Sequence, residues 1–268
     1  MSLKIRKPLE PGLTRLVDGE MKRIRFSILK LKPGETFSEN LSDWELCLVL
    51  LSGKCRVAVS GRDLGELGPR RDVFRDPAWA AYVPGGMSWQ VEAKSELCAA
   101  LGYAPGRGGE PRLIRPEDLV IRQRGRPGYE RRVVDIAVEK VPAQSLLVGE
   151  TFNAAGQWSS YPPHCHEKDD PGRESFQEEI YFYQVDPPQG FGYQRVYTDD
   201  RALDEAITVE HNDLVLLPRG YHPVAAAPGY CVYYLWVLAG TTRVMKPRDD
   251  PAHAWVEKGS GLQMKFND

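Results

Sequence analysis

Three histidines and one glutamate in the second half of the chain have the types and spacing of a metal site. His164 and His166 are separated by one residue, and in an extended strand residues i and i+2 point to the same face. Glu179 begins the next clear strand, and His222 follows a Pro-Arg-Gly turn. Three imidazoles and one carboxylate suit Zn, Mn, Fe, Co or Ni and leave coordination positions open for water or substrate. The pattern therefore predicts one divalent metal ion per chain, held by these four side chains.

Other candidate ligands fit this pattern less well. Glu178 neighbours Glu179, but in a strand it points to the opposite face. Cys165 lies between the two paired histidines and faces away from them, so we interpret it as a packed thiol. His211 and His253 have no partner at a useful spacing and are interpreted as surface or turn residues.

The elements that must position these side chains are predicted to be short strands. The 268 residues include 25 Gly and 21 Pro, spread along the chain among short runs of Val, Tyr, Leu and Thr. Residues 44–53 form a predicted strand that ends in a glycine turn, and residues 54–60 form its return strand. In the second half, residues 178–185 and 191–198 form a similar pair around a Pro-Pro-Gln-Gly turn. Amphipathic helical periodicity is scarce, so the chain is predicted to be mostly β.

The two halves resemble each other at a constant offset of 134 residues. This offset aligns Glu45 with Glu179, and it aligns Pro84, Gly86 and Ser88 with Pro218, Gly220 and His222. We interpret this as a duplicated all-β unit, with one two-sheet barrel in residues 1–130 and a second in residues 131–268. Residues 102–127, rich in Gly, Pro and Arg, are predicted to form an extended linker. The first half has no histidine, so we expect it to be a structural or oligomerising barrel.

Composition argues against several classes of partner. The formal net charge is −2, without the basic excess that nucleic acid or anionic lipid would require. The longest apolar run, Leu46 to Leu51, is too short to span a membrane. The N-terminal residues lack the apolar core of a secretory signal. Five cysteines without C-x-x-C spacing suggest reduced thiols. We therefore expect a cytoplasmic protein that binds neither nucleic acid nor membrane.

The order of these motifs resembles the cupin family: Gly156, then His164-Cys-His166, then Glu179, then His222 after a Pro-Gly turn. Cupins usually place the glutamate a few residues after the second histidine, whereas here twelve residues, 167–178, intervene. We expect this charged insert to loop over the barrel mouth. The resemblance implies a bicupin, with two tandem double-stranded β-helix (jelly-roll) barrels, and association into a homo-oligomer.

Longer segments are similar to one branch of the bicupin uronate isomerases, the 5-deoxy-glucuronate isomerases of inositol catabolism. The segments that carry this resemblance are Trp158 to His166, Glu178 to Tyr183, Pro187 to Asp200 and Pro218 to Ala225. The resemblance implies an aldose–ketose isomerisation of a small sugar acid, from 5-deoxy-D-glucuronate to 5-dehydro-2-deoxy-D-gluconate, without a redox cofactor.

Such a reaction gives roles to further residues. The metal would act as a Lewis acid on the substrate carbonyl or an adjacent hydroxyl and stabilise an enediolate, while a base that the sequence does not name moves the proton. Tyr181 and Tyr183 share the parity of Glu179, so they should face the barrel interior, either to hydrogen-bond sugar hydroxyls or to fill the core. Arg195 or Arg219 could bind the substrate carboxylate with two parallel hydrogen bonds.

Three alternatives remain open from the sequence. The sister 5-keto-4-deoxyuronate isomerases share the metal set but lack a segment like residues 187–192. A metal-dependent cupin dioxygenase could use the same ligands with iron or nickel. A sugar-binding or transcription-linked cupin without enzymatic activity would bind ligand without turnover, although no DNA-binding segment accompanies the barrels.

Overall fold

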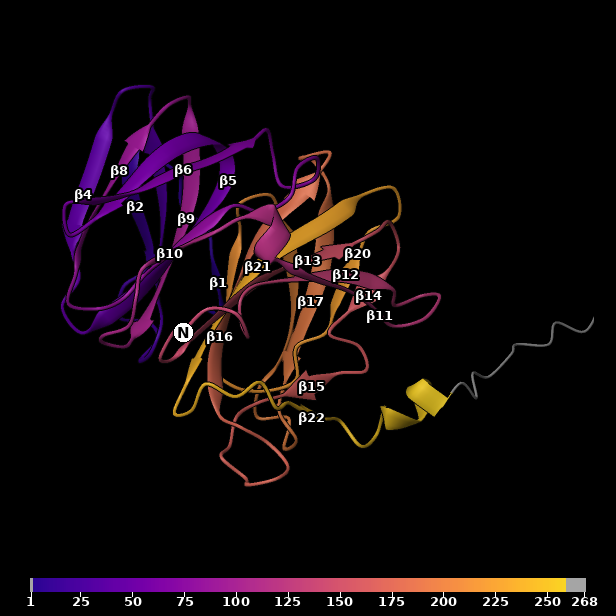
Figure 1. Cartoon of the computed structure of the whole chain (residues 1–268). Helices are drawn as coiled ribbons and strands as arrows, with labels where there is room; N and C mark the ends of the chain where they lie inside the picture. Colours follow the sequence, from indigo (N-terminus) through magenta and orange to yellow (C-terminus); the bar gives the residue numbers. More distant parts are fainter. Residues whose placement is uncertain (1, 259–268) are drawn as a thin grey trace, which may run out of the picture.

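The computed structural model describes residues 2–258 as two β-barrels that lie side by side (Figure 1). The described residues contain strands and two short 3-10 helices, η1 (Pro116–Asp118) and η2 (Ala254–Lys258), and no α-helix. None of the described helices is long or apolar enough to cross a membrane. The predicted all-β fold with two tandem barrels is confirmed.

The N-terminal barrel is built from two sheets that share one long strand. The first sheet has the order β10 (Arg112–Ile114), β7 (Ala80–Val83), β5 (Trp44–Val59), β9 (Leu97–Pro105), β3 (Arg25–Leu31) and β2 (Gly12–Val17). The second contains β4 (Thr36–Asn40), β8 (Ser88–Ala93), the far end of β5, and β6 (Arg62–Arg70). Along β8 exposed and buried residues alternate, because one face of the strand covers the barrel core.

Strand β5 corrects the predicted turn at residue 53. The chain continues through Gly53 as one strand of 16 residues, and its pairing shifts register on both sides of this glycine. Gly53 has φ +100°, and a Cβ there would lie 2.3 Å from the carbonyl oxygen of Glu96. A glycine in this conformation therefore forms a bulge that bends the strand from one sheet into the other.

The C-terminal barrel repeats this plan with broken strands. Its larger sheet has the order β1 (Lys4–Ile5), β19 (Leu214–Leu217), β16 (Gln177–Asp186), β21 (Cys231–Gly240), β13 (Leu146–Asn153), β12 (Arg131–Ala137) and β11 (Val120–Arg124). The facing sheet has the order β14 (Trp158–Ser159), β20 (Val224–Ala226), β17 (Phe191–Tyr197) and β18 (Asp204–Glu210). A third, two-stranded sheet pairs β15 (His164–Cys165) with β22 (Arg248–Asp249).

The two halves exchange short strands. Strand β1, at the start of the chain, pairs with β19 of the C-terminal barrel, whereas β10 pairs with β7 of the N-terminal barrel. Strand β11 pairs with β12, so by strand pairing the second barrel begins at β11 and not after residue 130. The region predicted as an extended linker, residues 102–127, thus contains the end of β9, both β10 and β11, and η1.

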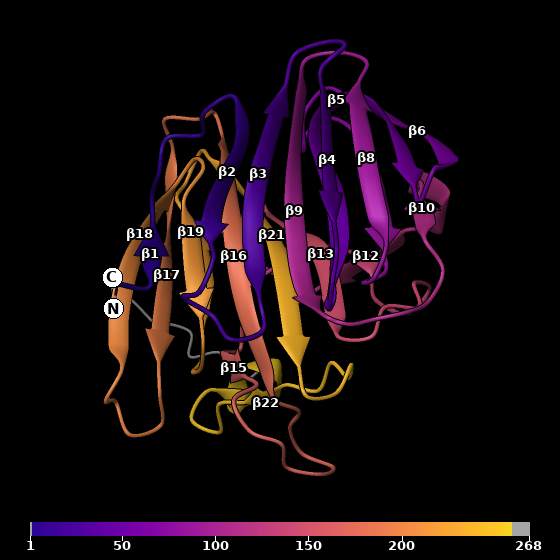
Figure 2. The ribbon, with the colours of Figure 1, turned by 90° about the vertical axis from the view of Figure 1, so that its left-hand side faces the viewer.

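A continuous core joins the barrels where their larger sheets pack against each other. In Figure 2, strands β3 and β9 of one sheet are seen beside β16 and β21 of the other. The rings of Phe26 and Phe182, one from each barrel, have centroids 5.6 Å apart. Arg70 and Glu150 form a two-pronged ion pair across this interface, with N–O distances of 2.7 and 3.0 Å, and both side chains are almost fully buried. The barrels therefore share one hydrophobic interior with a charged pair inside it.

Glu45, which the repeat aligns with Glu179, has a different role from its counterpart. It is fully buried, and its carboxylate accepts hydrogen bonds from the Tyr82 hydroxyl and from backbone N–H groups at the start of β13. The first half contains no histidine that could share a metal with Glu45. Its carboxylate instead connects the two barrels through these hydrogen bonds.

Candidate metal centre and substrate cavity

The histidine pair begins on strand β15, as the sequence pattern predicts. Cys165 points away from the site and is buried against Tyr197 and Tyr221. His164 lines a cavity in the C-terminal barrel, and His166 is buried beside it. The alternation of a strand thus separates the two imidazoles from the thiol.

His166, Glu179 and His222 converge inside the barrel. Each offers one ligand atom, and these atoms lie within 4.8 Å of one another. Oε2 of Glu179 lies 3.0 Å from Nε2 of His166 and 3.3 Å from Nε2 of His222. All three side chains are buried. Glu178 faces the other way and accepts hydrogen bonds from the backbone N–H groups of residues 22 and 23. The arrangement has the donor types of a metal site.

Backbone carbonyls fix the orientation of two imidazoles. Nδ1 of His166 lies 2.7 Å from the carbonyl oxygen of Gln177, and Nδ1 of His222 lies 2.9 Å from that of Gly220. Because a carbonyl oxygen can only accept, each Nδ1 carries a proton, and in the neutral ring Nε2 presents a lone pair. Nε2 of His222 is buried without a hydrogen-bond partner among the described residues. Two lone pairs that face a carboxylate oxygen fit a divalent cation between them.

The pKa shifts in this site follow from the burial of one carboxylate among three imidazoles. Burial lowers the pKa of His166, but the hydrogen bond and charge of Glu179 outweigh it and raise this pKa above its ordinary value. Burial raises the pKa of Glu179. Burial and the neighbouring histidines lower the pKa of His222 well below its ordinary value. A bound cation would take the place of the proton that the Glu179 carboxylate otherwise favours on Nε2 of His166.

His164 lies at the edge of this group. Its ring centroid is 4.8 Å from that of His222 and 6.4 Å from that of His166. Burial, together with the charges of His166 and Arg131, lowers the pKa of His164 to about 3. Its imidazole is therefore neutral near pH 7, which is the form that binds metal.

A cavity of about 400 Å³ opens onto Glu179 and His164. Hydroxyl groups line one part of it: Thr151, Ser160, Tyr181 and Tyr234. Arginines line another part: Arg122, Arg124 and Arg131. Apolar groups form much of the remaining wall: Val133, Val138, Trp236, Met245 and Pro247. Two carboxylates, Asp135 and Glu139, also line the cavity. Trp236 lies over Gly149, where a Cβ would lie 2.1 Å from its ring. The cavity thus offers hydrogen-bonding, cationic and apolar surfaces to a small polar ligand.

The two predicted tyrosines both face the barrel interior, as their parity indicates. Tyr181 lines the cavity, its hydroxyl lies 3.1 Å from Oγ of Ser160, and its ring stacks on Tyr234 with centroids 4.2 Å apart. Tyr183 lies outside the cavity lining, and its hydroxyl donates to Oε1 of Gln194 at 2.9 Å. Tyr181 is therefore placed to contact a ligand, and Tyr183 fills the core.

The structure does not bring Arg195 and Arg219 to this cavity. On strand β17 Gln194 faces inward, whereas Arg195 lies on the outer face, paired with Asp204 at 2.7 Å. Arg219 is exposed in the turn before His222. The arginines that do line the cavity come from β11 and β12, a region whose first strand the sequence analysis assigned to a linker. The alternation of Arg122 and Arg124 along one strand is the signal that could have indicated a shared face.

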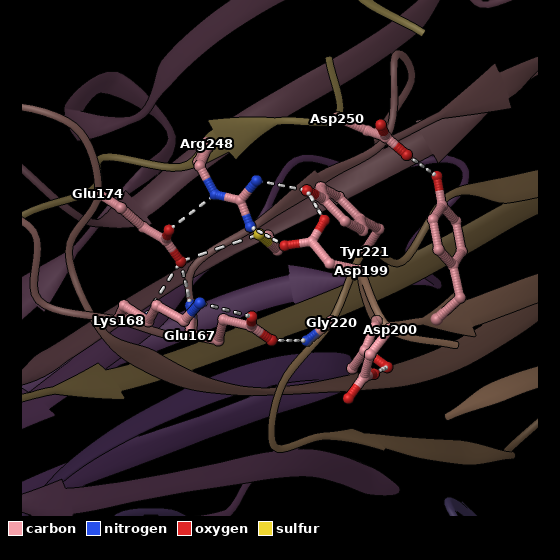
Figure 3. Close-up of polar contacts among 12 residues, drawn as sticks. Glu167, Lys168, Glu174, Asp199, Asp200, Gly220, Tyr221, Arg248 and Asp250 are labelled. Atoms are coloured by element: carbon pink, nitrogen blue, oxygen red, sulfur yellow. Dashed lines mark hydrogen bonds and ion pairs between the residues drawn. The ribbon is translucent and has the colours of Figure 1, made fainter. Parts of the chain in front are cut away.

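A polar network behind the histidines is centred on Arg248 of strand β22 (Figure 3). Its guanidinium donates to Glu174 at 3.0 Å, to the hydroxyl of Tyr221 at 2.5 Å and to Asp199 at 3.0 Å. The hydroxyl of Tyr221 in turn donates to Asp199 at 2.8 Å. One cation therefore joins three segments that are far apart in the sequence.

The same network reaches the segments that carry the metal-ligand candidates. Glu174 accepts hydrogen bonds from the backbone N–H groups of Glu167 and Lys168, next to His166. The carboxylate of Glu167 accepts from the N–H of Gly220 at 3.1 Å, next to the turn that holds His222 (Figure 3). The insert at 167–178 thus contributes two acceptors, the buried Glu174 and the partly buried Glu167, that connect the two histidine-bearing segments.

Comparisons with known proteins agree with this fold. The chain matches the model of the KduI/IolB family over residues 14–256. It is 45% identical over 235 residues to 5-deoxy-glucuronate isomerase of Geobacillus kaustophilus (strain HTA426), with 87% of this chain and 85% of that relative covered. It is 39% identical over 268 residues to 5-deoxy-glucuronate isomerase of Bacillus subtilis (strain 168), with 96% and 99% covered.

Solved structures give the same result. The crystal structure of an IolB-like protein from Salmonella typhimurium LT2 has a TM-score of 0.92 and 37% sequence identity, with 96% of this chain and all 100% of that chain covered. Oxalate decarboxylase from Lactobacillus farciminis has a TM-score of 0.67 at 12% identity, with 93% and 88% covered, and shares the fold alone. From the family match and the identity to its relatives, the chain belongs to the KduI/IolB family.

Proposed function

We propose that this protein is a metal-dependent 5-deoxy-glucuronate isomerase that converts 5-deoxy-D-glucuronate to 5-dehydro-2-deoxy-D-gluconate in inositol catabolism. The observation that carries the proposal is the convergence of His166, Glu179 and His222 on one point beside a cavity lined by hydroxyl groups and arginines. Relatives that are 39–45% identical over most of their length carry this name. A cytoplasmic location would fit an enzyme that acts on a metabolic intermediate.

His164, His166, Glu179 and His222 would hold one divalent ion, with His164 and Glu179 on the side of the cavity. When bound, such an ion supplies Lewis acidity toward the substrate carbonyl and the neighbouring hydroxyl, and it favours negative charge on those oxygens. The carbonyls of Gln177 and Gly220 keep Nε2 of two imidazoles directed at the site. Zn, Mn, Fe, Co and Ni all suit these donors.

Tyr181 is the residue best placed to assist the proton transfer from the cavity side. Burial raises the pKa of its hydroxyl well above the ordinary value, so the group stays protonated at neutral pH and can donate a hydrogen bond to a substrate oxygen. Ser160, 3.1 Å away, orients this hydroxyl. Trp236 and Val133 cover the apolar side of the cavity, and they would limit the access of water to the charge that develops on the sugar.

The function is tested with 5-deoxy-D-glucuronate in D2O, followed by proton NMR with and without a chelator. We expect conversion to a ketose with deuterium entering at the former C2, and no conversion after the metal is removed. Conversion that continues undiminished in chelator-treated, metal-free protein would contradict the metal-dependent mechanism. If metal-loaded protein leaves this substrate unchanged, 5-keto-4-deoxyuronate and then oxygen uptake should be assayed, to test the sister isomerase and the dioxygenase.

A further inference from the structure

Three arginines face the cavity from the hairpin of β11 and β12. Arg122 and Arg124 are two residues apart on β11 and therefore share one face. Arg124 pairs directly with Arg131 across the hairpin, and all three line the cavity that contains His164 and Glu179. The hairpin thus presents a cluster of positive charge to the same space as the metal-ligand candidates.

Only one of these charges is balanced by the protein. Arg122 donates to Asp135 at 3.0 Å and to Glu139 at 3.1 Å. Arg131 donates only to carbonyl oxygens, those of Tyr129 at 3.3 Å and Tyr161 at 3.1 Å. Among residues 2–258, Arg131 and Arg124 form no ion pair with a carboxylate within 4.0 Å; Arg131 is partly buried, whereas Arg124 is exposed. Two neighbouring cations therefore remain without an anionic partner.

This arrangement is unfavourable without a ligand. Burial lowers the pKa of Arg131, and the like charge of Arg124 lowers it further. Like charges directly opposite each other in a β-ladder are destabilising, and a desolvated cation is costly unless it is paired. The two carbonyl contacts hold the guanidinium in place but supply no negative charge. The site therefore favours a bound anion.

The position of Arg131 relates it to the metal-ligand candidates. Its guanidinium donates to the carbonyl oxygen of Tyr161, three residues before His164. The charge of Arg131 also contributes to the low pKa of His164. Arg131 thus contacts the segment that precedes His164, and the two side chains face one cavity.

We propose that Arg131, with Arg124 beside it, binds the carboxylate of the sugar acid and so directs the carbonyl end of the substrate toward His164 and Glu179. This inference rests on the proposed function, because it takes a uronate as the substrate. A six-carbon uronate carries its aldehyde and its carboxylate at opposite ends, so it has one group for each of these two parts of the cavity. A planar guanidinium binds a carboxylate through two parallel hydrogen bonds. The protein should therefore reject neutral aldoses.

The test compares Arg131→Met and Arg131→Lys with Arg195→Met, a matched control on the outer face of the same barrel. Binding of 5-deoxy-D-glucuronate to chelator-treated protein is measured by calorimetry, together with KM and kcat of the metal-loaded enzymes. We expect Arg131→Met to weaken binding and raise KM by roughly 10- to 100-fold, and Arg131→Lys to retain part of the affinity. Arg195→Met should behave as the wild type. Neutral 5-deoxy-D-glucose should bind the wild type and Arg131→Met equally weakly.

Unchanged uronate affinity in Arg131→Met would overturn the proposal, and so would loss of affinity in Arg195→Met alone. If Arg131→Met does not fold, the comparison of the uronate with 5-deoxy-D-glucose in the wild type still decides, since equal affinities would exclude a carboxylate site. A third outcome separates the two proposals. If the wild type binds the uronate tightly and Arg131→Met does not, but the wild type produces no ketose, the carboxylate site is supported and the proposed reaction is contradicted.

Discussion

At the scale of single residues, the site depends on which nitrogen of each imidazole is protonated. The carbonyl oxygens of Gln177 and Gly220 lie next to Nδ1 of His166 and His222, and this leaves both Nε2 atoms as acceptors around Glu179. An acceptor buried without a donor costs free energy. The side chains therefore favour a bound cation before any substrate is present.

Replacing His222 by Ala should remove both metal and activity, because the variant loses the buried acceptor whose lone pair has no partner within the described chain. Metal content after dialysis, measured by mass spectrometry, and turnover by NMR test this. His211→Ala is the control, since His211 contacts the backbone of Val185 at 3.2 Å, outside the site. Turnover by metal-free His222→Ala protein would contradict the mechanism.

At the scale of elements, the histidine-bearing strand depends on a distant part of the chain. Strand β15 has only two residues, and its partner in the ladder is β22. Strand β22 also supplies Arg248, which binds Glu174, Tyr221 and Asp199 (Figure 3). A strand this short has little intrinsic stability. The hydrogen bonds of Arg248 therefore help to hold β15 in position next to the turn before His222.

Arg248→Met should lower metal affinity by roughly tenfold, the lower end of the range for groups that orient metal ligands. It leaves the nearly buried carboxylate of Glu174 without its cation and frees the segment next to His166. Competition with a fluorescent chelator measures the affinity, and thermal unfolding of metal-free protein measures the fold. Equal affinity in Arg248→Met and wild type would show that the network does not support the site, as would an equal loss in Arg195→Met.

At the scale of the whole molecule, the two barrels behave as one structural unit. Strand β1 of the first half completes the larger sheet of the second, and Arg6 of the same segment pairs with buried Asp213 at 2.7 Å. The face-to-face sheets share a core that contains the Arg70–Glu150 pair. The N-terminal barrel thus supports the sheet on which Glu179 lies.

Arg70→Met should reduce the free energy of unfolding of the whole chain by about 3–5 kcal/mol, because Glu150 would remain buried without its partner. Replacing both residues, as in Arg70→Met with Glu150→Leu, should recover much of the loss, since apolar side chains of similar volume can substitute for a buried pair. Urea denaturation of the three proteins measures this. A loss below about 1 kcal/mol in the single variant would argue against tight coupling through this pair.

Local periodicity made several features predictable from the sequence. The spacing of His164 and His166 places both imidazoles on the side of β15 opposite Cys165, because strand geometry follows from alternation alone. The same rule places Tyr181 and Tyr183 inside the barrel with Glu179. The duplication and its offset likewise predicted two barrels, since repeated turn residues imply repeated strands.

Other features were decided only by the tertiary structure. Gly53 does not end a strand but forms a bulge within β5. Glycine is favoured in bulges as well as in turns, so the residue type alone could not distinguish the two. Of the arginines, sequence parity could not separate Arg195 on the outer face from Arg131 in the cavity, since which face of a strand is inside depends on the sheet that covers it. The sequence by itself determined the β-architecture and the candidate metal-ligand residues, which depend on local spacing. The tertiary structure decided the cationic cavity and the Arg248 network, since these bring together segments that are distant in the chain.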